Sequence, residues 1–199
     1  MKQIAKIFSG IVAFVVIQFN AFSQGCNALN ITHQADITST CNFMVMTMMH
    51  DELGRSYLYV ANKEAGLKVY DISTISTPSL VATVPKNLFD TLDVMNISQS
   101  GNYLYLALGN SFTNPQKGGM AIIDVTNPTT PAVTDYYVVP GSTSGGGIVK
   151  TEGNYAYLGA MQSGLVILDI SNKNNIQFVS QLIPSIAYPP IASPSASKY

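Results

Sequence analysis

The sequence predicts an all-β fold, a β-propeller of four-stranded antiparallel blades, with three blades present. The first observation is a threefold repeat. A Tyr-x-Tyr segment is followed by a glycine and an apolar run that ends in aspartate, and these runs are Gly66–Asp71, Gly119–Asp124 and Gly164–Asp169. A repeat of about 45 residues made of short strands is typical of propeller blades. The second observation is composition, because only 11% of residues are charged, whereas about 25% are charged in typical soluble domains.

Each unit contains four short apolar segments that favour strands. In the first unit, residues 43–90, they are Phe43–Met48, Ser56–Val60, Leu67–Tyr70 and Leu80–Val84. In the second unit, residues 91–140, they are Leu92–Ile97, Tyr103–Leu106, Met120–Ile123 and Ala132–Val138. In the third unit, residues 141–184, they are Gly147–Thr151, Tyr155–Gly159, Leu165–Asp169 and Ile176–Leu182. The continuous apolar run of Leu165–Asp169 predicts a strand buried on both faces, and the alternation in Ile176–Leu182 predicts an outer, partly solvated strand.

The N-terminus has the pattern of a secretory signal peptide. Two lysines, a short apolar stretch and the small residues Ala21 and Ser23 precede Gln24, so we expect residues 1–23 to be removed on export. The apolar stretch is too short to favour a membrane anchor, and no transmembrane segment is expected after cleavage. The remaining chain would have no basic run, which argues against a nucleic-acid partner. We expect an extracellular, cell-surface or periplasmic protein with an N-terminal segment over residues 24–42.

Two cysteines lie in that N-terminal segment. In an exported chain, Cys26 and Cys41 most simply form one disulfide. The alternative is that Cys26 carries a lipid after cleavage. Gly25 suits a lipidation signal, whereas Ser23 suits it poorly. Both alternatives stay open at the level of sequence.

The repeated polar residues favour a structural role over a chemical one. Asp71, Asp124 and Asp169 end their strands, where an aspartate readily accepts backbone N–H bonds from the following turn. A shared metal or catalytic site is the competing hypothesis, but equivalent positions in successive blades lie far apart. The glycines that open the same runs, Gly66, Gly119 and Gly164, are predicted to belong to the turns before them.

Few residues in this sequence indicate catalysis or metal binding. The chain has two histidines, His33 and His50, and no Cys or His cluster with metal-ligand spacing. The segment His50–Glu52 is interpreted as a solvated loop. We therefore predict no catalytic residue, no metal and no cofactor.

The best candidate contact surface is an insertion. The distance from first tyrosine to aspartate is seven residues longer in the second unit than in the other two, and the extra residues fall within 110–117. Phe112, Asn114 and Lys117 are the candidate contact residues, because loops on a rigid scaffold usually carry function. A harmless loop extension is the alternative.

The units resemble LVIVD repeats, a family of bacterial and archaeal β-propeller proteins. Leu165–Asp169 matches the family motif at four of five positions, Gly153–Tyr157 matches the preceding Gly-Asn-Tyr-Ala-Tyr signature, and Asp124–Pro128 matches the turn that follows the motif. The resemblance covers about residues 43–184. It implies an exported or cell-surface protein with no general catalytic residues assigned.

The resemblance and the residue inventory together favour a non-catalytic binding or scaffold module with a protein or glycan ligand. The alternatives are part of a propeller hydrolase or lyase whose catalytic residues lie in other blades, and a truncated product with no function of its own. Closed propellers usually have four to eight blades, and residues 185–199 form a Ser-, Ala- and Pro-rich tail or the start of a missing blade. The chain is thus expected to be a fragment of a longer propeller, to self-associate through exposed blade faces, or to stay an open stack.

Overall fold

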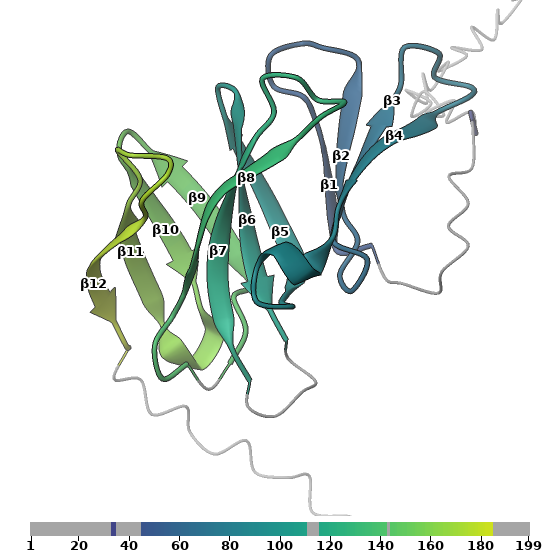
Figure 1. Ribbon diagram of the computed structural model, residues 1–199. Helices are drawn as coiled ribbons and strands as arrows, with labels where there is room; N and C mark the ends of the chain where they lie inside the picture. Colours follow the sequence, from purple (N-terminus) through teal and green to yellow (C-terminus); the bar gives the residue numbers. More distant parts are fainter. Residues whose placement is uncertain (1–32, 35–44, 111–115, 143, 185–199) are drawn as a thin grey trace, which may run out of the picture. The chain divides into compact units, whose positions relative to one another are not determined.

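The computed structural model describes residues 33–34, 45–110, 116–142 and 144–184. These residues form twelve strands and no α-helix, and every strand lies in the contact unit that begins at Gln34. The strands form three separate four-stranded sheets, each a meander in chain order (Figure 1). All pairings within the sheets are antiparallel. The predicted all-β fold with three propeller-type blades is confirmed.

The three sheets are called blades 1, 2 and 3. Blade 1 contains β1 (Thr47–His50), β2 (Tyr57–Ala61), β3 (Leu67–Asp71) and β4 (Ser79–Val84). Blade 2 contains β5 (Asp93–Ser100), β6 (Tyr103–Gly109), β7 (Gly118–Asp124) and β8 (Ala132–Val138). Blade 3 contains β9 (Ile148–Glu152), β10 (Tyr155–Gly159), β11 (Leu165–Asp169) and β12 (Gln177–Leu182). Two short 3-10 turns complete the elements, η1 (Lys86–Leu88) and η2 (Met161–Ser163), and no helix in the described part of the chain has the length and apolar character needed to span a membrane.

The three blades repeat one another in register as well as in strand order. In each blade, the first tyrosine of the second strand pairs with the aspartate that ends the third strand. In each blade, the ladder between the third and fourth strands also shifts by one residue at the same point. The unpaired residues of the fourth strands are Val81, Thr134 and Val179. The repeated sequence unit is therefore one structural unit, including its irregularity.

The core lies between the blades. One cluster of buried apolar side chains joins blades 1 and 2, and a second joins blades 2 and 3. The middle blade therefore buries both faces of β7, whereas β11 buries only Val166 and Leu168. The prediction that Leu165–Asp169 is buried on both faces is wrong, because no described strand packs on the face that carries Leu165 and Ile167.

The glycine before each third-strand run makes a close backbone approach. A side chain at Gly66 would meet the carbonyl oxygen of Val84, and a side chain at Gly164 would meet that of Leu182. Both glycines also have positive φ, 83° and 73°, which only glycine adopts at little cost. Gly119 makes the same approach to the carbonyl of Tyr137. These positions fix the distance between the third strand and the end of the fourth.

Candidate functional site

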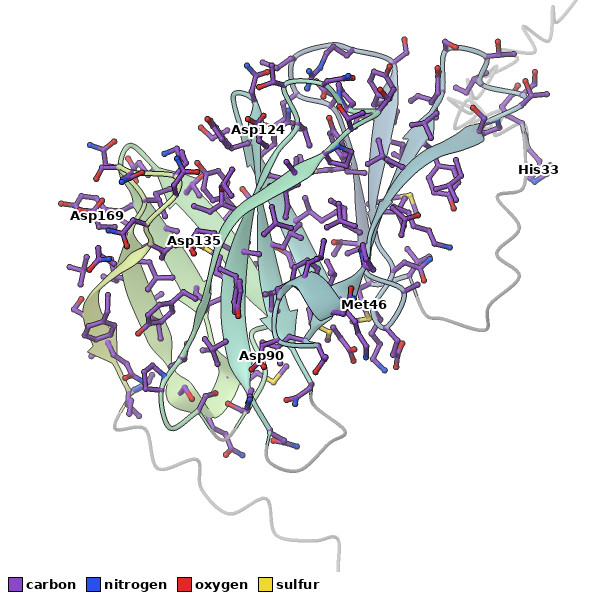
Figure 2. All side chains as sticks on the ribbon, in the orientation of Figure 1. His33, Met46, Asp90, Asp124, Asp135 and Asp169 are labelled. Carbon is purple, nitrogen blue, oxygen red and sulfur yellow. The ribbon has the colours of Figure 1, made fainter. Side chains whose placement is uncertain are left out.

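The motif aspartates each bind the turn that follows their strand. Oδ1 of Asp71 accepts the backbone N–H of Ser73 at 2.7 Å, and Asp124 and Asp169 accept the N–H two residues later at 2.7 Å and 2.8 Å. The hydrogen bond from Ser73 lowers the pKa of Asp71, and that from Ser171 lowers the pKa of Asp169. Figure 2 shows Asp124 and Asp169 on different sheets. Their carboxylates act locally and do not converge on one site.

The two ends of the blades differ in backbone strain. The loop end comprises the turns between second and third strands and the crossovers between blades, and the turn end comprises the remaining turns. Among the described residues, all four non-glycine residues with positive φ lie at the loop end, and they are Lys63, Asp90, Thr91 and Met161. Such conformations cost about 1–3 kcal/mol each and cluster at functional sites. At the turn end, the described residues with positive φ are all glycines, namely Gly54, Gly101 and Gly153. The loop end is therefore the better candidate for function.

The insertion of the second unit belongs to this loop end. Its base continues the β6–β7 hairpin, where Gly109 pairs with Gly118 and the N–H of Asn110 donates to the carbonyl of Lys117 at 3.2 Å. The ammonium of Lys117 binds Oδ2 of Asp90 at 2.7 Å, which ties the hairpin to the crossover between blades 1 and 2. Figure 2 shows Asp90 at the opposite end of the sheets from Asp124 and Asp169. Of the predicted contact residues, Lys117 lies here, whereas Phe112 and Asn114 lie outside the described residues.

A hollow of about 270 Å³ lies beside the base of the insertion. It is lined by Gln116, Lys117 and residues 138–142, so apolar Val138, Val139 and Pro140 meet polar groups around it. Ser142 is held in place, because its hydroxyl donates to the carbonyl of Ser144 at 2.6 Å and accepts a bond from Ser163. The volume is slightly below the roughly 300 Å³ at which drug-sized pockets begin.

A buried ionic cluster at the turn end joins blades 1 and 2. Oδ2 of Asp51 accepts hydrogen bonds from Arg55 at 2.6 Å and from the Tyr59 hydroxyl at 2.5 Å, while Oδ1 accepts the N–H of Leu53 at 2.8 Å. Arg55 also donates to the carbonyl of Val125 in blade 2 at 2.9 Å. Burial alone would raise the pKa of Asp51, but the bonds from Arg55 and Tyr59 outweigh it and the pKa is lowered. The cluster is fully engaged within the protein, so we assign it to assembly of the blades.

The interpretation of His50–Glu52 as a solvated loop is wrong at its centre. Asp51 is only 5% exposed, because blade 2 covers it and Arg55 neutralises it. The sequence offered a weak signal, since Asp51 and Arg55 are spaced four apart around a turn at which the other two units have Gly101-Asn102 and Gly153-Asn154. Burial pushes up the pKa of Tyr59, with the Asp51 hydrogen bond adding to it. The burial of Asp51 could not be predicted from the sequence, because it depends on contacts between blade 1 and blade 2.

The remaining predicted sites are partly outside the described residues. Cys26 and Cys41, with the predicted disulfide, lie outside them, as do residues 1–32. Across the part of the chain that the structure describes, no group of three or more His, Cys, Asp or Glu side chains could hold a metal ion. His50 ends β1 and is exposed.

Comparison with known proteins identifies the repeated unit. Three segments of the chain match the family model described as the LVIVD repeat, and they are residues 55–85, 93–138 and 147–182. Together they cover more than half of the chain, one match for each blade. No curated protein matches the chain.

Proposed function

The chain belongs to the LVIVD-repeat family, and we propose that it acts as an exported, non-catalytic binding module of β-propeller type. Its ligand is a protein or a glycan, bound at the loop end of blade 2. The family match supports the propeller scaffold. Scaffold and function are separate matters, so the site itself must support the binding role.

The observation that supports binding most strongly is that the strained backbone conformations and the base of the insertion within residues 110–117 both lie at the loop end of the blades. Asp90 and Thr91 hold positive φ in the crossover, and Asp90 anchors Lys117 at the base of the insertion. A β-branched residue such as Thr91 rarely adopts this conformation. The hollow is lined by Lys117, Ser142 and Gln116, which carry an ammonium, a hydroxyl and an amide, and by the apolar residues Val138, Val139 and Pro140. Such a surface suits hydrogen bonding to a polar ligand better than chemistry on one.

Binding is tested with a double substitution in the hollow. Labelled protein is applied to an oligosaccharide array, and a photo-crosslinker at position 116, which also lines the hollow, is used on intact cells to capture a protein ligand. Lys117→Ala with Ser142→Ala should abolish the array signal or the crosslinked adduct. Lys150→Ala is the matched control, because Lys150 is an exposed lysine on β9 and its removal should leave binding unchanged. The absence of binding in both assays, or binding insensitive to the double substitution, would contradict the proposal. Release of a hydrolysis product from the array would favour the enzyme alternative.

Export is tested on the protein recovered from outside the cytoplasm. The proposal expects an N-terminus at Gln24 and a mass two hydrogens below that of the reduced chain, as one disulfide requires. A diacylglycerol adduct on Cys26 would contradict the disulfide and show that the protein is anchored by a lipid. A chain that keeps residues 1–23 and stays in the cytoplasm would contradict export.

A further inference from the structure

Methionine is concentrated at the start of blade 1. Four of the eight methionines of the chain fall within residues 44–49, and His50 follows directly. Met44 lies outside the described residues. Alternate residues of a strand point to the same face, so Met48 and His50 share one face of β1. Met49 points to the other face, opposite Tyr59.

This face of β1 is accessible. Met48 is 62% exposed and His50 is exposed as well. Met48 pairs with Val60 and His50 with Leu58, and β1 is an edge strand of its sheet. Met46, labelled in Figure 2, precedes β1, is partly buried and packs against the core between blades 1 and 2. The exposed pair is therefore Met48 and His50.

The chemistry of the pair selects a soft metal ion. A thioether and an imidazole favour Cu(I), whereas Mg²⁺, Ca²⁺ and Mn²⁺ prefer oxygen ligands. The nearest carboxylate along the chain is Asp51, and both of its oxygens already accept hydrogen bonds from Leu53, Arg55 and Tyr59. Hard ions thus gain no carboxylate from Asp51.

We propose that the thioether of Met48 and the imidazole of His50 bind one Cu(I) ion on the exposed face of β1. Alternate Cα atoms of a strand are about 6.7 Å apart, and both side chains are long enough to meet midway. Met has three rotatable bonds and adapts its sulfur position readily. The site goes beyond the proposed binding function and lies on a different blade from the hollow.

The test uses the purified full chain with Cys26→Ser and Cys41→Ser, because thiolates also bind Cu(I). Under anaerobic reduction, Cu(I) held by the chromophoric chelator bicinchoninate is titrated with the protein. We expect one equivalent to be withdrawn, and Met48→Leu or His50→Ala to weaken binding at least tenfold. Met161→Leu is the matched control, because Met161 is 52% exposed but lies at the loop end, and it should leave the affinity unchanged.

A second measurement covers the case in which a variant folds poorly. Ag(I), a diamagnetic ion of similar softness, is added to the same protein with ¹³C-labelled methionine methyl groups. The Met48 methyl signal should shift most, and the Met161 signal should not move. Failure of the protein to withdraw Cu(I), an equal loss in Met161→Leu, or an unmoved Met48 signal would each overturn the proposal.

Discussion

Between blades 1 and 2, the guanidinium of Arg55 donates to the carbonyl of Val125 and contacts the hydroxyl of Tyr59. Between blades 2 and 3, the ammonium of Lys173 donates to the carbonyl of Ile170 and lies 5.9 Å from the ring centroid of the second tyrosine of blade 2. Both carbonyls belong to the residue after the motif aspartate. The two cations take corresponding positions, although Arg55 comes from the preceding blade and Lys173 from the following one.

The two interfaces differ in what accompanies the cation. The first buries a carboxylate, since the side chain of Asp51 is fully buried beside Arg55. At the second interface, no carboxylate of the described residues is buried beside Lys173. The carboxylate of Asp135 instead accepts the N–H of Ile176 at 2.7 Å. The first two units have Pro78 and Pro131 in place of Ile176, and proline has no N–H. The repeated backbone thus leaves the same carbonyl in blades 2 and 3 in need of a hydrogen-bond donor. Each interface supplies that donor from a different residue.

The largest expected effect is at the first interface. Arg55→Ala leaves the Asp51 carboxylate buried without its cation, and such a loss costs about 3 kcal/mol of unfolding free energy. Urea denaturation at neutral pH measures the change. Arg55→Lys keeps the charge and should recover part of the loss. A cost below about 1 kcal/mol would show that Asp51 does not depend on Arg55.

The hydrogen bond of Asp135 should rank second. Asp135→Ala leaves the N–H of Ile176, a residue only 6% exposed, without its acceptor, and we expect a loss of about 2 kcal/mol in the same assay. Asp135→Asn keeps an oxygen at that position and serves as the control. Equal destabilisation by both variants would mean that the charge matters and the hydrogen bond does not.

Lys173→Met should lower the unfolding free energy by less than Arg55→Ala does. This difference directly tests whether the two interfaces depend on their cations to different extents. The variant keeps the apolar stem and loses the ammonium over Tyr103 and Tyr105, a contact worth about 1 kcal/mol. The measurement is again urea denaturation, with salt added in a second series. A loss as large as that of Arg55→Ala would make the two interfaces energetically equivalent.

The turn aspartates should matter equally in all three blades. Replacing Asp71, Asp124 or Asp169 by Ala removes one acceptor from an exposed turn, and by analogy with helix caps each loss should lower the melting temperature by a similar small amount. Thermal unfolding of the three single variants measures it, and Asp→Asn at each position is the control. Loss of ligand binding at unchanged thermal stability would contradict the structural role.

The pH dependence of the first interface should be the smallest effect. The folded-state pKa of Asp51 lies below its ordinary value of 3.8, so its contribution is fully present above that pH and is lost as pH falls through the folded-state pKa. The difference in unfolding free energy between the wild type and Asp51→Asn should therefore stay constant near neutrality and shrink below pH 3.8. A difference that grows on acidification would reverse the sign of the pKa shift.

Sequence alone was sufficient for features that are set locally. Apolar runs, glycine positions and the seven-residue insertion predict twelve strands in three meanders, because pairing between neighbours along the chain needs no distant information. Burial between blades was not predictable in the same way. Asp51 looks like part of a polar turn, and its partner Arg55 is bound by the carbonyl of Val125, which lies 70 residues after Arg55 in the sequence.

In the candidate site, too, the local features could be predicted and the contacts between distant segments could not. Lys117 could be chosen from the insertion, but its partner Asp90 lies 27 residues away in a crossover. The strain at Thr91 has no sequence signature, because threonine rarely adopts positive φ. Leu165 and Ile167 fit a doubly buried strand by pattern, yet their exposure depends on what packs against blade 3.

The one-residue register shift in every fourth strand has a consequence for solubility. Each fourth strand forms an edge of its sheet, and an edge of regular hydrogen-bonding groups is a template for pairing with another chain. β12 is exposed along its whole length and carries Phe178 and Val179, a combination that favours aggregation. The extra residue at Val179 interrupts the row of backbone donors and acceptors and increases the local twist. The shift therefore hinders a thirteenth strand from adding to this edge while the protein is at high concentration.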